Sequence, residues 1–423
     1  MNVDTMRRID YWAGIPLCAL LTPLVQLRDK LRGRKNIKQQ LKPQRVLLIE
    51  LSEMGSAVIV DPAMRLAQSR GAELFFLIFA SNRHSLALLN TVAPQNVLTI
   101  RAESLLTLVT DTLKVLWTIQ KLNIDTVIDL ELFSRFTALL TGLSGAGRRV
   151  GFHSFHNEGL WRGDMLTHKV SCNPHIHIAK NFVALIEAAF ASTKQRASPP
   201  LGKFIVSDDQ IQLAQADVPI TEQRALTQRI EQLALAAGLN WQAGQHPLIL
   251  INANASDLLP QRRWPPARFA ELIAQLAQNL PDALFLLTGS ANENAYVDQV
   301  RTASGCHRAL NFAGAVKFAE LPALYCIADL MVTNDSGPGH FAAVTPLQTV
   351  VLFGPETPKL YGSLGKSIAI TANLACSPCV SASNHRKTPC SDNACMQAIS
   401  VAQVTQTVLH ALPSKPSAPP LTT

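Results

Sequence analysis

The hydrophobic pattern of the chain alternates between short, continuous apolar runs and longer segments with helical spacing. Short apolar runs bounded by turn residues are typical of buried parallel strands. The first half of the chain predicts such strands at Arg45–Leu51, Leu74–Phe79, Val97–Ile100, Asp125–Leu130 and Arg149–Phe152. The alternation then starts again, and the second half predicts strands at Pro247–Asn252, Ala283–Thr288, Asp329–Thr333 and Thr349–Phe353.

Segments with helical periodicity lie between these runs. They are a stretch that ends at Ser69, and then Ser104–Leu122, Pro266–Leu280, Ala291–Thr302, Leu321–Ile327 and Gly337–Val344. Strands that alternate with helices predict parallel sheets with helices on both faces, so two such sets predict two doubly wound α/β domains. The predicted divisions are an apolar and basic segment at 1–40, a first domain at 41–196, a linker at 197–204, a second domain at 205–375, a Cys-rich loop and C-terminal helix at 376–412, and a disordered tail at 413–423.

The N-terminal segment has a composition that bears on membrane association. The mostly apolar run Tyr11–Leu27 is interrupted by Pro16 and Pro23, and basic residues follow it. A spanning helix needs about 20 apolar residues, and no clear signal-peptide cleavage site follows the run. Two interpretations remain: an interfacial helix or hairpin with its basic side toward anionic lipid, or a leader segment packed on the protein's own surface.

Composition narrows the class of protein. Of the 423 residues, 48% are hydrophobic, which excludes a disordered chain, and only 16% are charged. The net charge of +8 suits an anionic ligand or an anionic membrane face, but it is too diffuse to indicate nucleic acid. Scattered cysteines without a cleavable signal favour a reducing cytoplasm.

The segment Asp329–Gly354 carries the strongest chemical signal. A predicted strand ends at Asn334-Asp335, and the sequence Ser336-Gly337-Pro338-Gly339 then turns the chain into a helix near His340. The first N–H groups of a helix are free to bind phosphate, and glycines allow close approach of a ligand. A helix capped by Asp335 or Ser336 is the simpler interpretation, and it is compatible with a phosphate site.

This segment resembles glycosyltransferase family 9, which includes the ADP-heptose:lipopolysaccharide heptosyltransferases. The strings NDSGPGHFAA and VVLFGP look like the family's nucleotide-binding signature. Three further strings are similar to other parts of the family and extend the resemblance over Arg45–Gly354: RVLLIELSEMGSAVIVDPAM, ILINANASDLLPQRRWPPARFAELIAQL and LFLLTGSANENAYV.

The resemblance implies a GT-B fold, in which two Rossmann-like domains face a cleft. It also implies inverting, metal-independent transfer of a sugar, usually heptose from ADP-heptose, to a lipid-linked saccharide such as the lipopolysaccharide core. The enzyme would be cytoplasmic, on the inner face of the cytoplasmic membrane. Two alternatives are a transferase that uses a different nucleotide sugar, and an inactive member that binds a nucleotide sugar without turnover.

The resemblance also assigns donor-binding residues. Arg262, two residues before Trp264, matches the family's phosphate-contacting lysine, and Arg263 beside it is expected to face solvent. Glu293 matches the ribose-contacting acid loosely. The loop that would bind phosphate and sugar consists of Asp335, Ser336, Gly337, Pro338, Gly339 and His340.

The catalytic base is where the chain departs from the family. Family members commonly carry an Asp directly after the glycine of the first turn, and here that position is Ser56. Because the attacking hydroxyl must lose a proton, a nearby carboxylate is required. We predict Glu53 on the same turn as the base, with Asp61 and Glu50 next in order; the alternative is that Glu53 caps the following helix.

Four cysteines fall close together near the C-terminus: Cys376, Cys379, Cys390 and Cys395. Four thiolates can close a tetrahedral zinc site, and such a site would leave no open position for catalysis. A structural zinc ion therefore competes with an ordinary reduced loop and with a disulfide. No metal is predicted for the catalytic step.

Overall fold

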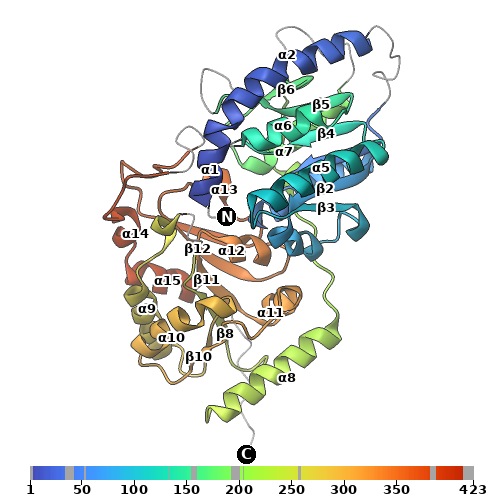
Figure 1. Cartoon of the computed structure of the whole chain (residues 1–423). Helices are drawn as coiled ribbons and strands as arrows, with labels where there is room; N and C mark the ends of the chain where they lie inside the picture. The colour runs from blue at the N-terminus through green and yellow to red at the C-terminus, as the bar shows by residue number, and fades with distance from the viewer. Residues whose placement is uncertain are drawn as a thin grey trace, which may run out of the picture. The chain divides into compact units, whose positions relative to one another are not determined.

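The structure is a computed structural model that describes residues 3–33, 42–51, 54–132, 134–153, 160–191, 201–202, 204–255, 259–381 and 387–412. The chain divides into two compact units. The first unit contains residues 1–212 and 381–386, and the second contains residues 213–380 and 387–423. Each unit is built on one parallel sheet with helices packed on it (Figure 1), as the alternating sequence pattern predicts.

The sheet of the first unit has seven strands in the order β3-β2-β1-β4-β5-β6-β7, all parallel. The strands are β1 Arg45–Ile49, β2 Glu73–Phe79, β3 Val97–Ile100, β4 Thr126–Asp129, β5 Arg148–His153, β6 His168–Ser171 and β7 Leu201–Gly202. The first five match the predicted strands to within two residues at each end. The sequence did not predict β6 and β7, because they are short and lack a continuous apolar run.

The principal helices of the first unit are α3 Met54–Ile59, α4 Asp61–Ser69, α5 Leu105–Lys121, α6 Arg135–Leu143 and α7 Ile178–Phe190. Shorter 3₁₀ turns are η2 Ala80–Leu88, η3 Pro94–Asn96 and η5 Asp209–Ile211. The predicted helical stretch to Ser69 is confirmed as two helices with a break at Val60, where Pro62 in the first turn of α4 lacks the N–H that a continuous helix would use. Ser104 caps α5 by accepting a hydrogen bond from the N–H of Thr107.

Two further helices, α1 Val3–Trp12 and α2 Gly14–Gly33, precede the first sheet and pack on the first unit. Cys18 and Val25 of α2 are buried against Ala138 and Leu139 of α6. No helix in the described part of the chain has the length and apolarity needed to cross a membrane.

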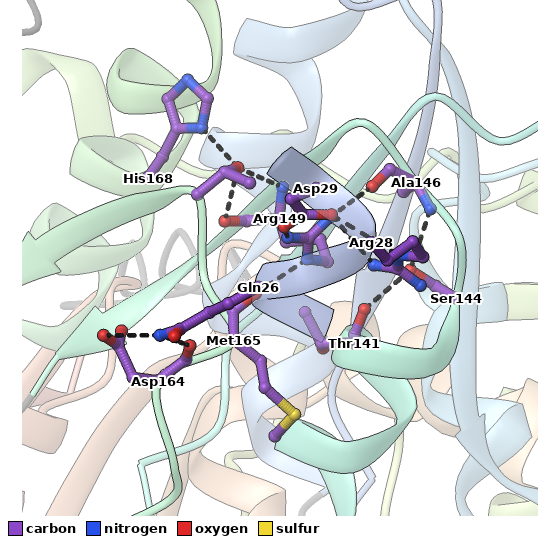
Figure 2. Close-up of polar contacts among 11 residues, drawn as sticks. Gln26, Arg28, Asp29, Thr141, Ser144, Ala146, Arg149, Asp164, Met165 and His168 are labelled. Carbon is purple, nitrogen blue, oxygen red and sulfur yellow. Dashed lines mark hydrogen bonds and ion pairs between the residues drawn. The ribbon is translucent and has the colours of Figure 1, made fainter. Parts of the chain in front are cut away.

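A buried arginine anchors α2 (Figure 2). Arg149 on β5 is 2% exposed; its Nε donates to the carbonyl of Met165 at 2.8 Å, its Nη1 donates to the carbonyl of Ala146 at 2.7 Å, and its Nη2 pairs with the carboxylate of Asp29 on α2. Asp10 anchors α1 in a similar way, because Oδ1 accepts from the backbone N–H groups of Arg135 and Phe136 at 2.8 and 2.9 Å.

The second unit has a six-stranded parallel sheet in the order β10-β9-β8-β11-β12-β13. Its strands are β8 Leu248–Asn252, β9 Leu284–Leu287, β10 Ala309–Asn311, β11 Leu330–Asn334, β12 Gln348–Phe353 and β13 Ser367–Thr371. The predicted strands are confirmed, and β10 and β13 at the two edges are additions. The buried residues of β8, β9, β11 and β12 form the centre of the core.

The helices of the second unit surround this sheet. They are α8 Ile220–Ala236, α9 Pro266–Asn279, α10 Asn294–Ala303, α11 Leu321–Ile327, α12 Gly337–Ala342, α13 Pro358–Tyr361, α14 Ala394–Ala398 and α15 Val401–Ala411, with 3₁₀ turns η6 Pro260–Arg262, η7 Ala291–Glu293 and η8 Phe318–Glu320. The C-terminal helix α15 packs against α9, so the segment after the Cys-rich loop contributes to this core.

The chain passes from the first unit to the second between residues 212 and 213, later than the predicted linker at 197–204. Within that linker, Leu201–Gly202 form β7 and pair with β6. Beyond it, η5 packs on α7, and Lys180 Nζ lies 2.8 Å from Asp208 Oδ1. These contacts keep residues up to 212 with the first sheet. The predicted tail at 413–423 lies outside the described residues.

Candidate active site

In each sheet the connections run outward in opposite directions from one central pair of neighbouring strands. This pair is β1 and β4 in the first unit, and β8 and β11 in the second. Ligands of open α/β sheets bind at the carboxyl ends of such a pair, where the crossovers leave a crevice. We call these two places the first switch point and the second switch point.

At the second switch point, Arg262 places a buried guanidinium beside the end of β11. The residue is 9% exposed, and its Nη1 donates to the carbonyl of Asp335 at 3.3 Å and lies 3.7 Å from the carboxylate of that residue. Its Nε has no hydrogen-bond partner. A buried donor left unpaired costs free energy, so a guanidinium in this position is prepared to bind an anionic group.

Two asparagines at the end of β8 add unpaired acceptors to the second switch point. The Nδ2 atoms of Asn252 and Asn254 donate to the carbonyl of Thr288 at 3.3 and 3.2 Å. The Oδ1 atoms of both side chains are buried and have no hydrogen-bond partner. These residues were not predicted from the sequence. The signal that could have identified them is the pair of amides at the end of the apolar run Leu248–Asn252 and just after it.

The loop that carries Arg262 is held by Trp264 and Asn334. Trp264 is fully buried and stacks edge-on against Phe269, and its Nε1 donates to the carbonyl of Ile399 at 3.1 Å. Its backbone N–H donates to Oδ1 of Asn334 at 3.0 Å, and Nδ2 of Asn334 donates to the carbonyl of Ala253 at 2.9 Å. The first residue of the predicted NDSGPGH loop therefore ties β8, β11 and the Arg262 loop together.

The rest of that loop begins α12 as predicted. Ser336 is the residue before the helix, but its Oγ hydrogen-bonds the carbonyl of Asn334 at 3.1 Å and does not cap the helix. The missing side chain of Gly337 makes room for the aromatic ring of Phe341, because a Cβ at this position would lie 2.9 Å from that ring. A Cβ on Gly339 would make only ordinary contacts. Pro338 and His340 complete the first turn of α12.

Arg263 and Glu293 make contacts that the sequence did not predict. Arg263, expected to face solvent, is half-buried and donates from Nε and Nη2 to the carbonyl of Ala255 at 3.0 and 2.6 Å. Glu293 is half-buried at the end of η7. Its Oε2 accepts from the N–H and Oγ of Ser290 at 2.7 and 2.8 Å, so this oxygen caps the turn.

At the first switch point, Ser56 lies half-buried in α3, just after the end of β1. Glu53, the predicted base, lies outside the described residues. Glu131 also lies at this edge, and its Oε1 accepts from the N–H of Leu51 at 3.1 Å. Glu131 was not predicted from the sequence, because nothing in its local pattern shows that the ends of β1 and β4 are adjacent.

The next candidates for the base are engaged in the fold. Asp61 is fully buried, with Oδ2 at 2.8 Å from Nε of Arg65 and Oδ1 accepting from Thr91 at 2.5 Å. Glu50 is also buried. Asp129 at the end of β4 pairs with Arg162 at 3.0 Å, yet its complete burial raises the pKa of its carboxyl. Asp61 therefore contributes to the packing of α4 through Arg65 and Thr91.

The four clustered cysteines are all free thiols in the structure. Burial raises the pKa of Cys395, and the nearby Cys379 and Cys390 add to that increase. Among the described residues, however, no three His, Cys, Asp or Glu side chains are gathered closely enough to hold a metal ion.

Comparison with known proteins agrees with this geometry. The sequence profile of glycosyltransferase family 9 (heptosyltransferase) matches residues 113–388. The chain is 31% identical over 119 residues to lipopolysaccharide heptosyltransferase 2 of Salmonella typhimurium. That match spans 27% of this chain and 33% of the relative, so the chain matches about a third of that relative's length.

Solved structures extend the similarity over most of the chain. The Escherichia coli ADP-heptose LPS heptosyltransferase II has a TM-score of 0.63 at 20% identity, covering 87% of this chain and 98% of that one. An E. coli heptosyltransferase solved with ADP has a TM-score of 0.57 at 17% identity, covering 87% of this chain and all of that one (100%). These likenesses confirm the GT-B type of α/β fold. Because the family profile matches more than half of its length, the chain belongs to glycosyltransferase family 9 (heptosyltransferase).

Proposed function

We propose that this protein is an inverting glycosyltransferase that moves a heptose from ADP-heptose to a lipid-linked saccharide such as the lipopolysaccharide core. The observation that carries the proposal is the set of unpaired buried polar atoms at the second switch point: Nε of Arg262 and Oδ1 of Asn252 and Asn254. Family membership gives these atoms a natural partner, because a sugar nucleotide offers a diphosphate to the guanidinium and hydroxyl donors to the amide oxygens.

Transfer is proposed to need no metal ion. The bond between the anomeric carbon and the diphosphate oxygen breaks as the acceptor oxygen bonds to that carbon, and the nucleoside diphosphate leaves with the bonding electrons. Its developing charge can be stabilised by a guanidinium fixed in a buried site. Arg262 has that position, held by the Trp264 and Asn334 contacts.

The acceptor hydroxyl must give up its proton as the new bond forms. We propose Glu53 as the base, because it follows β1 by a few residues and precedes α3 directly. Ser56, at the position where family members commonly carry an Asp, cannot accept the proton at neutral pH. The engagement of Asp61 with Arg65 and Thr91 favours Glu53 over that alternative.

The lipid-linked acceptor further leads us to propose that the protein works at the inner face of the cytoplasmic membrane. A structural zinc ion on Cys376, Cys379, Cys390 and Cys395 stays a proposal as well, because the four cysteines fall close together in the sequence. Zinc binding would require the four sulfurs to draw together from the arrangement described above.

Turnover is the test of the main proposal. Purified full-length protein is incubated with ADP-heptose and with lipopolysaccharide that lacks the outer heptoses, and mass spectrometry follows the acceptor. Addition of one heptosyl unit, with release of ADP, is the expected result. Transfer from another nucleotide sugar alone, with release of the nucleoside diphosphate of that donor, would indicate a different donor. Tight binding of ADP-heptose without any transfer would indicate an inactive family member.

A further inference from the structure

The first unit exposes an unusual amount of apolar surface on α2. Leu17, Leu20, Leu24, Leu27 and Leu31, which we call the leucine stripe, are between 44% and 62% exposed. Their alternating spacing of three and four residues places them along one side of the helix. The stripe is distinct from the side that Cys18 and Val25 bury against α6.

A second apolar stripe lies on α5. It consists of Leu106, Val109, Leu113 and Trp117, which are between 49% and 74% exposed. At one end of it, the ammonium of Lys121 lies 5.1 Å from the centre of the Trp117 ring. A tryptophan beside a lysine is typical of side chains at a membrane–water interface. Most large hydrophobic side chains that the described residues expose belong to α1, α2 and α5.

Both stripes lie on the same side of the first sheet. Val127 of β4 is buried in one cluster with residues of α5 and α6, so these helices cover its face of the sheet. Arg149 is the register partner of Val127 on the neighbouring strand and therefore points to the same face. Since Arg149 pairs with Asp29, α2 belongs to that face too (Figures 1 and 2).

The charges around α2 favour an anionic partner. Between residues 11 and 44 the only acidic residue is Asp29, and its carboxylate pairs with buried Arg149. Lys30 on α2 is exposed, and Arg32, Arg34, Lys35 and Lys38 follow in the sequence. A second copy of this chain would bring the same positive charge to the contact, whereas an anionic lipid surface would neutralise it.

We propose that the leucine stripe and the α5 stripe together dock the first unit on an anionic lipid bilayer, with α2 lying parallel to the membrane plane. The anchors of α1 and α2 on the unit, at Asp10 and Asp29, keep the helix axis along the protein surface. Because the helix is held in this orientation, its leucines insert together into the boundary between the lipid headgroups and the acyl chains. This inference rests on the proposed lipid-linked acceptor, and it names the surface that meets the lipid.

Vesicle flotation tests the docking surface. Full-length protein is mixed with vesicles of phosphatidylglycerol and phosphatidylethanolamine, or with phosphatidylcholine alone. We expect partition into the anionic vesicles and little into the neutral ones. The triple variant Leu20→Gln/Leu24→Gln/Leu27→Gln should reduce partition at least about tenfold. The control Ile220→Gln/Leu235→Gln, which alters side chains of α8 in the second unit that are at least as exposed as Leu24 and Leu27, should partition like the wild type.

Two additional measurements separate the outcomes. Equal partition of the triple variant and the wild type, or no partition of the wild type, would overturn the docking proposal. A wild-type dimer that the triple variant converts to monomer would identify a second copy as the occupant and would overturn it too. Turnover of a delipidated, soluble acceptor should be unchanged in the triple variant, so loss of vesicle binding is distinguished from failure of the proposed transferase activity.

Discussion

The two switch points share one strand order but differ in the state of their polar groups. At the second switch point, Arg262 Nε and the amide oxygens of Asn252 and Asn254 are buried without partners. At the first, Asp129 is paired with Arg162, and Glu131 accepts from the backbone of Leu51. Close by on α4, Asp61 is paired with Arg65.

This difference indicates which of the two units is preorganised to bind a ligand. Unpaired buried groups are costly unless a ligand completes them, so the second switch point is preorganised for one. The first unit instead uses its buried charges to hold its own elements, including Arg149, which fixes α2 through Asp29.

The largest expected effect is at the first switch point. Glu53→Gln removes the proposed base and retains much of its size, so turnover should fall by about 10²–10⁴ while ADP-heptose affinity is unchanged. Steady-state kinetics and calorimetric titration measure the two quantities.

Glu50→Gln is the matched control on the preceding strand end, and it should retain turnover. Near-wild-type turnover of Glu53→Gln would place the base elsewhere. A sharp rise in turnover for Ser56→Asp would identify the protein as a weakened relative rather than one with a relocated carboxylate.

Asp29→Ala should destabilise the first unit, because it leaves the buried guanidinium of Arg149 without its counter-charge. Because Asp29 is itself 31% exposed, the expected cost lies between that of an exposed and that of a fully buried pair, at about 2 kcal/mol, which denaturant unfolding would measure. The matched control is Asp4→Ala, which removes an exposed pair with Arg7 and should change the free energy of unfolding by less than about 1 kcal/mol. Equal effects of both variants would contradict the anchoring role of Arg149.

Arg262→Ala should weaken binding of ADP by ~1.5–3 kcal/mol, since a charge-assisted contact to the diphosphate is lost. Arg263→Ala is the control beside it, because that guanidinium is already bonded to the carbonyl of Ala255. Titration calorimetry measures both, and a thermal melt of each variant checks folding. The same ADP affinity in wild type and Arg262→Ala would remove the phosphate assignment.

The smallest expected effect on turnover concerns the cysteines. If Cys376, Cys379, Cys390 and Cys395 hold structural zinc, reduced protein should contain about one zinc per chain, and chelation should leave the initial turnover rate unchanged. Elemental analysis measures the metal, with Cys306→Ser as a control outside the cluster. Metal-free protein with all thiols titratable would show that the segment is a reduced loop.

Much of the fold could be predicted from the sequence because buried parallel strands leave continuous apolar runs. The apolar runs Arg45–Leu51 and Pro247–Asn252 predicted β1 and β8. Each of these strands belongs to the central pair at its switch point. The strands β6 and β7, which end the first sheet on one side, are short and lack a continuous apolar run, so no local pattern identified them.

The candidate site was predictable only where its residues are close in sequence or match a family motif. Arg262 and the loop around Ser336 were found in this way. Asn252, Asn254 and Glu131 were missed, because their importance depends on partners at Thr288 and Leu51 that are distant in the chain. The ion pair of Asp29 with Arg149 was missed for the same reason.

Hydrogen exchange of the full-length protein, with and without ADP-heptose, tests most directly whether the donor site lies on the second unit. We expect slower amide exchange at residues 252–255, 259–263 and 334–340 around the second switch point, and we expect this protection to be reduced in Arg262→Ala. Peptides at the ends of β1 and β4 should exchange as in the free protein. Protection confined to β1 and β4, with none around Arg262, would contradict a donor site on the second unit.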